Sequence, residues 1–143
     1  MAIVFRRMTL KDHAEAVRLW EAAEGVWVSA ADSRANARRY LRRNPGLSFV
    51  ARDKGRLVGA ALCGHDGRRG YIYHMAVAPS HRRRGVGRSL AARCLSGLRA
   101  LGIHKCHLFV HAGNPGGKRF WRAIGWTPRP DVLLMSKDTG ADR

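Results

Sequence analysis

Residues 77–90 have the sequence VAPSHRRRGVGRSL, and they join the end of an apolar strand, predicted over 71–78, to a long amphipathic helix. Backbone N–H groups at the start of a helix lack partners within the helix, and the helix dipole adds partial positive charge there. Gly85 and Gly87 have no side chain, so a phosphate can approach the backbone closely between the flanking arginines. The stretch therefore predicts a pyrophosphate-binding loop.

Two common phosphate motifs do not fit this loop. A Walker loop needs Gly-Lys-Ser/Thr, which is absent, and a dinucleotide fingerprint needs a third glycine where the chain has Leu90. What remains is Arg82-x-x-Gly85-x-Gly87 directly after a strand. This pattern resembles the CoA-binding motif, Arg/Gln-x-x-Gly-x-Gly/Ala, of the GNAT superfamily of acetyl-CoA-dependent N-acetyltransferases.

A second segment carries the same resemblance. Asn114 precedes a short helix that ends in Trp121-x-x-x-Gly125-Trp126, and the family has an Asn and an aromatic–x–x–x–Gly–aromatic run at these places. Further matches resemble the bacterial YpeA-type subgroup, namely Leu19-Trp20-Glu21, Trp27, Asp66-Gly67 and Asp131-Val132-Leu133.

Hydrophobic periodicity and turn residues predict the element order β-α-α-β-β-β-α-β-α-β-β, with residues 126–137 as a last hairpin. The resemblance implies an α/β (α+β) single-domain GNAT fold. Its central mixed sheet would be mostly antiparallel, with about 6–7 strands, about four flanking helices, and a V-shaped splay between the fourth and fifth strands. We expect the domain over 1–137 and a short polar tail over 138–143.

The resemblance also implies how acetyl-CoA, the acyl donor, is held. Backbone groups of Met75, Ala76 and Val77 would contact the pantetheine arm and the thioester carbonyl. The pyrophosphate would be bound by Arg82, Arg83, Arg84, Gly85, Val86, Gly87, Arg88 and Ser89. Asn114 would bind the pantetheine from the other side.

Acetyl transfer to an amine needs a base, because an ammonium group with a pKa near 10 must lose a proton before it attacks. Some relatives carry Glu or His on the strand before the loop, at positions matching Tyr71 and Tyr73, and Tyr73 could order a water in a proton relay. His74 has the better proton affinity, but strict alternation points it to the other face unless a bulge re-aims it. We keep Tyr73 and His74 as the catalytic hypotheses.

Trp121 is a departure from the family pattern, because many members have a Tyr there that protonates the leaving thiolate. An indole N–H donates a hydrogen bond but cannot transfer a proton near neutral pH. The thiolate would then leave unaided or with help from a water or another side chain. Because of its position, Trp121 stays among the residues expected at the donor site.

The acceptor is expected between the first two helices and the last strands, where Glu21, Glu24 and Asp32 could attract a cationic amine and Trp27 and Trp126 could form an apolar wall. The sequence leaves open a small-molecule amine or a peptide amine. We expect direct attack in a ternary complex. The alternative is a GNAT-fold module that binds CoA or nucleic acid with little catalysis.

Composition sets the remaining expectations for a chain of 143 residues. The formal net charge is +17, and 22 of the 27 cationic side chains are Arg, so nonspecific binding of polyanions is expected even where codon bias explains some arginines. No apolar run could span a membrane, and three cysteines form no CxxC pair, so a cytoplasmic location is expected. A homodimer is compatible with the resemblance.

No metal is expected. His107 and His111 share one face of a predicted strand but lie about 13 Å apart along it, which is too far for one zinc ion.

Overall fold

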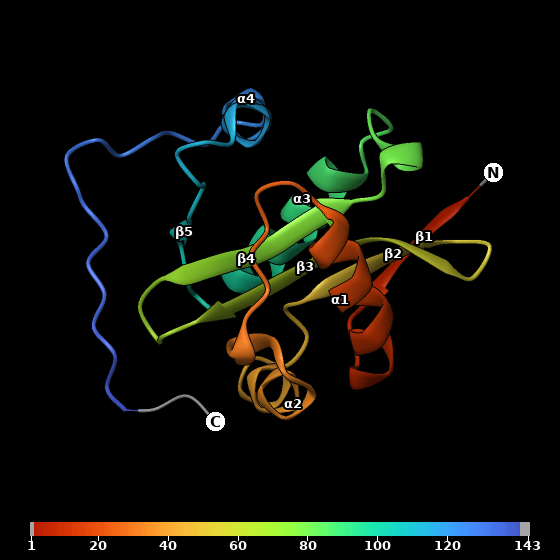
Figure 1. Ribbon diagram of the computed structural model, residues 1–143, viewed down its shortest axis with the longest axis horizontal. Coiled ribbons are helices and arrows are strands. Elements are labelled where there is room, and N and C mark those ends of the chain that lie inside the picture. Colours follow the sequence, from red (N-terminus) through yellow and green to blue (C-terminus); the bar gives the residue numbers. More distant parts are fainter. Residues whose placement is uncertain (1, 141–143) are drawn as a thin grey trace.

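The computed structural model describes residues 2–140, and its centre is one five-stranded sheet in the order β1-β2-β3-β4-β5 (Figure 1). The first four strands pair antiparallel, and β5 pairs parallel to β4. Their bounds are β1 Ile3–Arg7, β2 Phe49–Asp53, β3 Arg56–His65, β4 Gly70–Val77 and β5 Cys106–Leu108. The mixed, mostly antiparallel sheet is confirmed, with fewer strands than the 6–7 expected.

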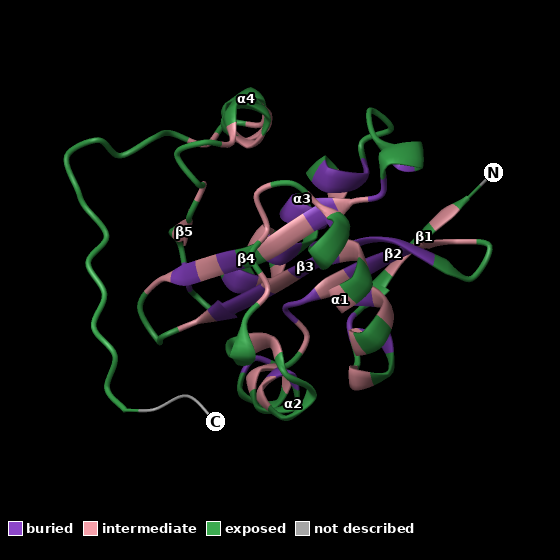
Figure 2. Cartoon of the chain, viewed as in Figure 1, coloured by how far each residue is buried: buried purple, intermediate pink, exposed green. Residues whose placement is uncertain are grey.

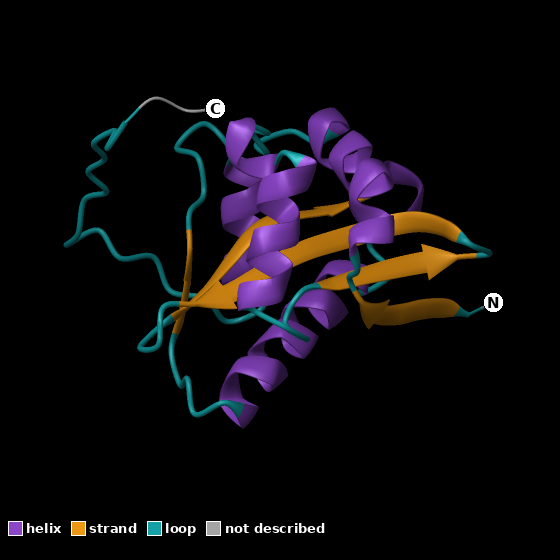
Figure 3. Cartoon of the chain, turned by 90° about the horizontal axis from the view of Figure 1, so that it is seen from below, coloured by secondary structure: helices purple, strands orange, loops and turns teal. Residues whose placement is uncertain are grey.

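Four α-helices flank the sheet, and Figure 3 shows helices on both of its sides. They are α1 His13–Ala22, α2 Arg34–Arg43, α3 Val86–Ala100 and α4 Pro115–Ala123, with short 3-10 turns η1 Leu10–Asp12, η2 Ala30–Asp32 and η3 Pro79–His81. No helix within residues 2–140 is both long enough and apolar enough to cross a membrane.

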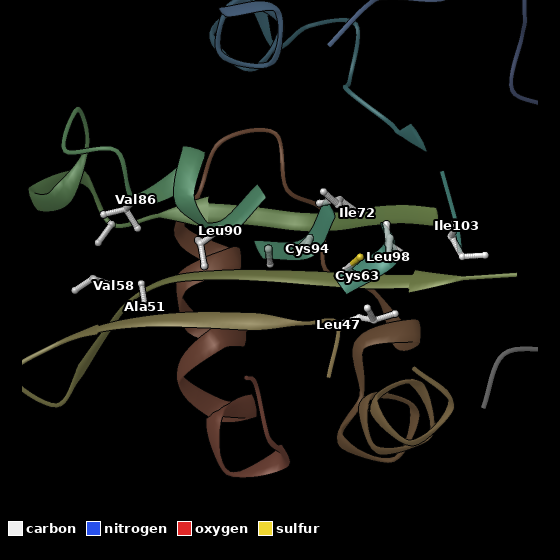
Figure 4. Close-up of a cluster of buried hydrophobic side chains, with 12 residues drawn as sticks. Leu47, Ala51, Val58, Cys63, Ile72, Val86, Leu90, Cys94, Leu98 and Ile103 are labelled. Carbon is white, nitrogen blue, oxygen red and sulfur yellow. The ribbon is translucent and has the colours of Figure 1, made fainter. Parts of the chain in front are cut away.

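The sheet separates two hydrophobic clusters. On one face Val86, Leu90, Cys94 and Leu98 of α3 pack on β2, β3 and β4 (Figure 4). These positions recur every three or four residues, as an amphipathic helix requires. On the other face the buried indole of Trp20 in α1 is the largest side chain of the second cluster. The central strand β3 is accordingly the most buried strand (Figure 2).

A β-bulge interrupts β4 in the middle of the sheet. The register runs from Ile72 opposite Cys63 and Tyr73 opposite Leu62 to Ala76 opposite Ala60, so β4 has one residue more than β3 across this stretch. His74, inside the bulge, has a φ of 53°, a left-handed conformation that is uncommon for a residue with a side chain. The bulge ends the simple alternation of side chains along β4.

The predicted hairpin over 126–137 is not formed. Within the described part of the chain, the residues after α4 adopt no strand, and they run past β5 without joining the sheet (Figure 1). Pro128 and Pro130 lack the backbone N–H that a central strand donates, which explains why no strand forms at the start of the segment. Val132, Leu133, Leu134 and Met135 remain exposed.

Candidate functional site

A cavity of about 830 Å³ opens where β4 and β5 separate. The two strands pair only from Gly70 to Ile72 of β4, opposite Cys106 to Leu108 of β5. Beyond Ile72 the chain after β5 turns away toward α4, while β4 continues along β3. Residues 73–77 therefore present an edge of backbone to the cavity. The predicted splay between the fourth and fifth strands is present.

The loop after β4 forms one end of this cavity. The backbone N–H groups of residues 84–88 donate to no acceptor within residues 2–140, and Ser89 is the first to donate, to the Gly85 carbonyl at 3.0 Å. Gly85 has a φ of 78°, which glycine adopts without strain, and a Cβ there would meet no atom within 4 Å. The start of α3 thus offers unpaired N–H donors and an open surface, as anion binding requires.

Gly87 brings the start of α3 close to the opposite wall. A Cβ at this position would lie 3.0 Å from Cζ of Phe120 and 3.3 Å from Cε of Met75. Both side chains line the cavity. A larger residue at position 87 would push these side chains into the space that a ligand needs.

Asp53 and His81 anchor the loop to the end of β2. His81 is buried, and its Nε2 lies 2.7 Å from Oδ2 of Asp53, while its Nδ1 lies 2.7 Å from Oγ of Ser80. The hydrogen bond with His81 holds the pKa of the Asp53 carboxyl below its usual value. This link fixes where the loop leaves β4 and is independent of any ligand.

The opposite wall comes from α4 and from the loop between α1 and α2. Asn114 caps α4, since its Oδ1 accepts the N–H of Gly117 at 3.0 Å, and a Cβ on Gly25 would lie 2.3 Å from its Nδ2. Trp121 packs edge to face with Phe120 and Trp126 at centroid distances of 5.0 and 5.1 Å. The indole of Trp121 is therefore a fixed part of the wall.

His74, which lines the cavity, forms a hydrogen-bonded pair with Asp32, which lies outside the lining. Nε2 of His74 lies 2.9 Å from both carboxylate oxygens of Asp32, and the ring stacks at a tilt 5.3 Å from Trp20. Because Trp20 belongs to α1, the bulge has turned His74 to the face that carries α1 and α2. Strict alternation would have pointed it to the other face, so the bulge decides the position of this side chain.

Asp32 is ionised in this arrangement. Burial opposes its ionisation, but the hydrogen bonds from His74 and from the Ser29 N–H outweigh burial and hold its pKa below the usual value. An ionised carboxylate only accepts hydrogen bonds, so Nε2 of His74 carries the proton. In the neutral ring Nδ1 then has the lone pair, and it makes no hydrogen bond within residues 2–140.

Tyr73 belongs to a row of aromatic side chains on the same face. Its ring lies 6.2 Å from that of Tyr71 and 6.1 Å from that of Phe109. Burial raises the pKa of Tyr73, so its hydroxyl stays neutral. Tyr73 and His74 both line the cavity, as neighbours in the bulged strand.

Most residues that the sequence predicted for this site line one cavity. They are Tyr73, His74, Met75, Ala76, Val77, Arg82, Arg83, Gly85, Val86, Gly87, Arg88, Asn114 and Trp121. Arg84 and Ser89 are not in its lining. Of the residues predicted for the acceptor site, Glu24 and Trp27 are in the lining, whereas Glu21, Asp32 and Trp126 are not.

Two side-chain pairs at the site could not be predicted from the sequence. Asp32 and His74 are 42 positions apart, and the stack of Trp27 on His111 at 4.1 Å also joins distant segments. No local pattern signals either pair, because each depends on where the loop between α1 and α2 crosses β4 (Figure 1).

Within residues 2–140 no group of three or more His, Cys, Asp or Glu side chains is placed to hold a metal ion.

Known proteins resemble the chain along most of its length. The model of the acetyltransferase (GNAT) family matches residues 11–126. An acetyltransferase of Sodalis glossinidius, SG1711, is 31% identical over 128 residues, which cover 88% of each protein. One of Pectobacterium atrosepticum, ECA0875, is 36% identical over 111 residues, covering 76% of this chain and 77% of the relative.

Solved structures share the fold. The PaiA N-acetyltransferase of Thermoplasma acidophilum, solved with coenzyme A, superposes with a TM-score of 0.78 at 17% identity, covering 89% of this chain and 91% of that one. The aminoglycoside acetyltransferase AAC(6')-Iy, solved with a bisubstrate analogue, has a TM-score of 0.78 at 20% identity over 96% of this chain and 99% of that one.

Proposed function

Because the chain belongs to the GNAT family of acetyltransferases, we propose that it transfers the acetyl group of acetyl-CoA to a primary amine by direct attack in a ternary complex. The observation that carries this proposal is the cavity between β4 and β5, which ends at the unpaired N–H groups of residues 84–88. A long ligand with a phosphate at one end and a reactive group at the other fits such a site.

The donor site consists of backbone more than side chains. Bound acetyl-CoA supplies an electrophilic thioester carbonyl. The N–H groups at the start of α3, together with Arg82, Arg83 and Arg88, would hold its pyrophosphate. The open edge of Met75, Ala76 and Val77 would bind the pantetheine amides and offer an N–H to the carbonyl oxygen, where negative charge develops.

Asn114 has a narrower role than the resemblance implies. Its Oδ1 already accepts the Gly117 N–H, whereas its Nδ2 amide makes no hydrogen bond within residues 2–140 and can donate to the pantetheine arm. Arg84 and Ser89 lie outside the cavity lining, so Arg84 would contribute only charge at a distance, and Ser89, whose N–H donates to the Gly85 carbonyl, would make no direct contact.

His74 is the base that the geometry favours. With Nε2–H held by Asp32, Nδ1 can accept the proton that the ammonium group of the acceptor must lose, directly or through one water. Asp32 acts through His74, as a positioning residue that fixes the ring and stabilises the imidazolium cation. Tyr73, neutral beside it, would order a water at the same face.

Because Trp121 stands where many relatives have a tyrosine acid, the thiolate would leave without receiving a proton from this position. Its ring is fixed between Phe120 and Trp126, and its indole N–H can donate a hydrogen bond but no proton. A thiol comparable to a Cys side chain has a pKa of about 8.5, so its thiolate is an acceptable leaving group near neutral pH.

The first experiment is a calorimetric titration with acetyl-CoA, followed by an assay of thiol release against a panel of primary amines. We expect binding and amine-dependent release. Binding without release from any amine would contradict the proposed acceptor class. An absence of binding would overturn the assignment of residues 82–88 to the donor site.

Variants then test the base. His74→Ala should lower kcat/KM about 100-fold or more, since general-base catalysis contributes at least that factor, while the Kd for acetyl-CoA stays within threefold. Asp32→Asn should lower kcat/KM about tenfold and move the rising limb of its pH profile to lower pH, because the imidazolium cation loses its carboxylate.

Glu21→Gln is the matched control, because Glu21 is an exposed acid outside the cavity lining and should leave both constants and the pH profile unchanged. If Asp32→Asn lowered kcat/KM without moving the pH profile, Asp32 would be a structural residue only.

A further inference from the structure

Helix α2 has an unusual concentration of positive charge. Five of its ten residues are arginines, it contains no acidic residue, and the five are Arg34, Arg38, Arg39, Arg42 and Arg43. All five are exposed, while Ala37 is buried and Tyr40 and Leu41 are partly buried against the domain. The solvent-facing half of α2 is therefore an arginine surface, which we call the arginine face.

The charges of the arginine face are not neutralised within the fold. Like charges four positions apart on a helix repel each other, and Arg34, Arg38 and Arg42 form such a row. Arg39 donates to the side chain of Asn36, but Arg38, Arg42 and Arg43 make no hydrogen bond or ion pair with any residue between 2 and 140. Together with Ala35 and Arg39 they line a shallow surface depression.

This surface begins at the candidate acceptor site. Asp32, which pairs with His74, lies two residues before the first residue of α2, and Ser33 caps the helix through the N–H of Asn36. At a rise of 1.5 Å per residue, Arg38 and Arg42 lie about 9 and 15 Å beyond Asp32 along the helix. The acidic partner of a cavity-lining residue is thus followed by a row of basic groups outside the cavity.

We propose that the arginine face binds an acidic segment of a polypeptide acceptor while an aliphatic amine of the same polypeptide enters the cavity. The inference rests on the proposed function and names its substrate class. The cationic amine meets Glu24 and His74 in the cavity, and carboxylates further along the peptide meet the guanidinium groups. An extended peptide advances about 3.3 Å per residue, so the acidic residues should begin about three to five positions from the amine.

Two further observations favour this occupant. A protein with a net charge of +17 repels small cationic amines at long range but attracts an amine whose carrier is acidic. Nucleic acids also suit arginine, but the amino groups of their bases are conjugated with the rings and are poor nucleophiles. A peptide supplies both carboxylates for bidentate arginine contacts and a reactive amine.

The test compares two synthetic peptides that share a free N-terminus and one lysine at position 2, and that carry at positions 5–8 either four Glu or four Gln. Competition with a fluorescent acidic peptide measures binding to the CoA-loaded protein, and thiol release measures turnover. We expect kcat/KM for the Glu peptide to be at least about tenfold higher at low salt. The advantage should shrink as salt is raised, because these are exposed charges.

The triple variant Arg38→Gln, Arg42→Gln, Arg43→Gln should abolish the advantage of the Glu peptide and leave turnover of the Gln peptide unchanged. Gln preserves helix propensity, so the fold should be kept. The matched control removes three exposed arginines outside the cavity and outside α2, Arg56, Arg68 and Arg99, each changed to Gln. It lowers the net charge equally and should retain most of the advantage.

Three results would overturn the inference. Equal kcat/KM for both peptides, or equal loss in both triple variants, would mean that the arginine face does not select the acceptor. Binding of duplex DNA that depends on the arginine face, without preference for the Glu peptide, would make it a nucleic-acid surface. If the protein bound acetyl-CoA and acetylated no amine, the proposed function would fail separately, and the competition assay would still decide whether the acidic peptide docks on α2.

Discussion

Strand β4 has two edges that differ in pairing. Toward β3 it is paired along most of its length, with one bulge, whereas toward β5 it is paired only from Gly70 to Ile72. Residues 70–72, which are paired on both edges, are the paired half of β4; they lie against α3 and form part of the core. Residues 73–77, which are paired only toward β3, are the open half and form the wall of the cavity. One strand therefore supplies both stability and a binding surface, and the bulge at His74 lies close to where the two halves meet.

Substitutions of similar size should therefore have different consequences in the two halves of β4. On the paired half they should lower the free energy of unfolding and leave ligand affinity intact. On the open half they should weaken ligand binding and leave the fold intact.

The largest effect is expected from Gly87→Leu on the open side. A side chain here collides with Phe120 and Met75, both of which line the cavity. We expect the Kd for acetyl-CoA, measured by calorimetry, to rise about 100-fold, which corresponds to about 2.7 kcal/mol. Gly113→Leu is the control, because a Cβ there meets no atom within 4 Å. An unchanged Kd for Gly87→Leu would mean that the ligand does not approach the start of α3.

The second effect belongs to the paired side. Gly70 faces α3 so closely that a Cβ would lie 2.4 Å from Cδ1 of Leu98, a fully buried core residue. Gly70→Ala should therefore lower the free energy of unfolding by about 2 kcal/mol through overpacking. Urea titration measures this loss. A rise in the Kd for acetyl-CoA of more than threefold in the folded protein would show that the two halves of β4 are coupled.

The limits of sequence reasoning follow the same division. The loop over residues 82–88 and its glycines could be predicted because anion binding at a helix start has a local signature. The bulge could be named only as an alternative, since one additional residue in β4 leaves no mark in its apolar pattern. The pair of Asp32 and His74 could not be predicted, because it depends on two segments that meet only after folding.

The predicted hairpin in the C-terminal segment is absent for another reason. The sequence, with its apolar run over 132–135, predicted a hairpin over 126–137, but a strand forms only where a neighbour accepts its hydrogen bonds. β5 is only three residues long, and the prolines at 128 and 130 interrupt the approach to it. Pattern indicates the capacity to pair, whereas pairing itself depends on the available edge.

Acid pH should lower the stability of the fold through Asp12, which lies outside the candidate site. Asp12, fully buried, binds Arg6 and Arg52 at 2.7 and 2.8 Å and holds α1 on β1 and β2, far from the cavity. Burial opposes its ionisation, but the hydrogen bonds from Arg52, Thr9 and Arg6 prevail, so the pKa of Asp12 is lowered on folding. A lowered pKa in the folded state contributes stability above the unfolded value near 4, and this contribution is lost as the pH falls through the folded pKa.

Asp12→Asn should therefore cost about 1.5 kcal/mol at pH 7 and flatten the dependence of stability on pH between about 5 and 2. Asp32→Asn, which removes the carboxylate bonded to His74 of the open half, should change this stability profile less than it changes kcat/KM. Urea titrations of both variants across this pH range test the distinction. An equally steep acid loss in Asp12→Asn and in the unchanged protein would show that other carboxylates control acid unfolding.

The smallest effect is expected beyond the sheet, where the chain passes the open edge without pairing. Leu133 and Leu134 are 86% and 67% exposed, so changing both to Ser removes almost no buried apolar surface. The free energy of unfolding should change by less than about 0.5 kcal/mol, as for other surface substitutions. The conservative pair Leu133→Ala and Leu134→Ala should behave alike. A loss of about 2 kcal/mol or more in both variants would mean that residues 132–135 are buried in solution and that the open side of the sheet is closed by this segment.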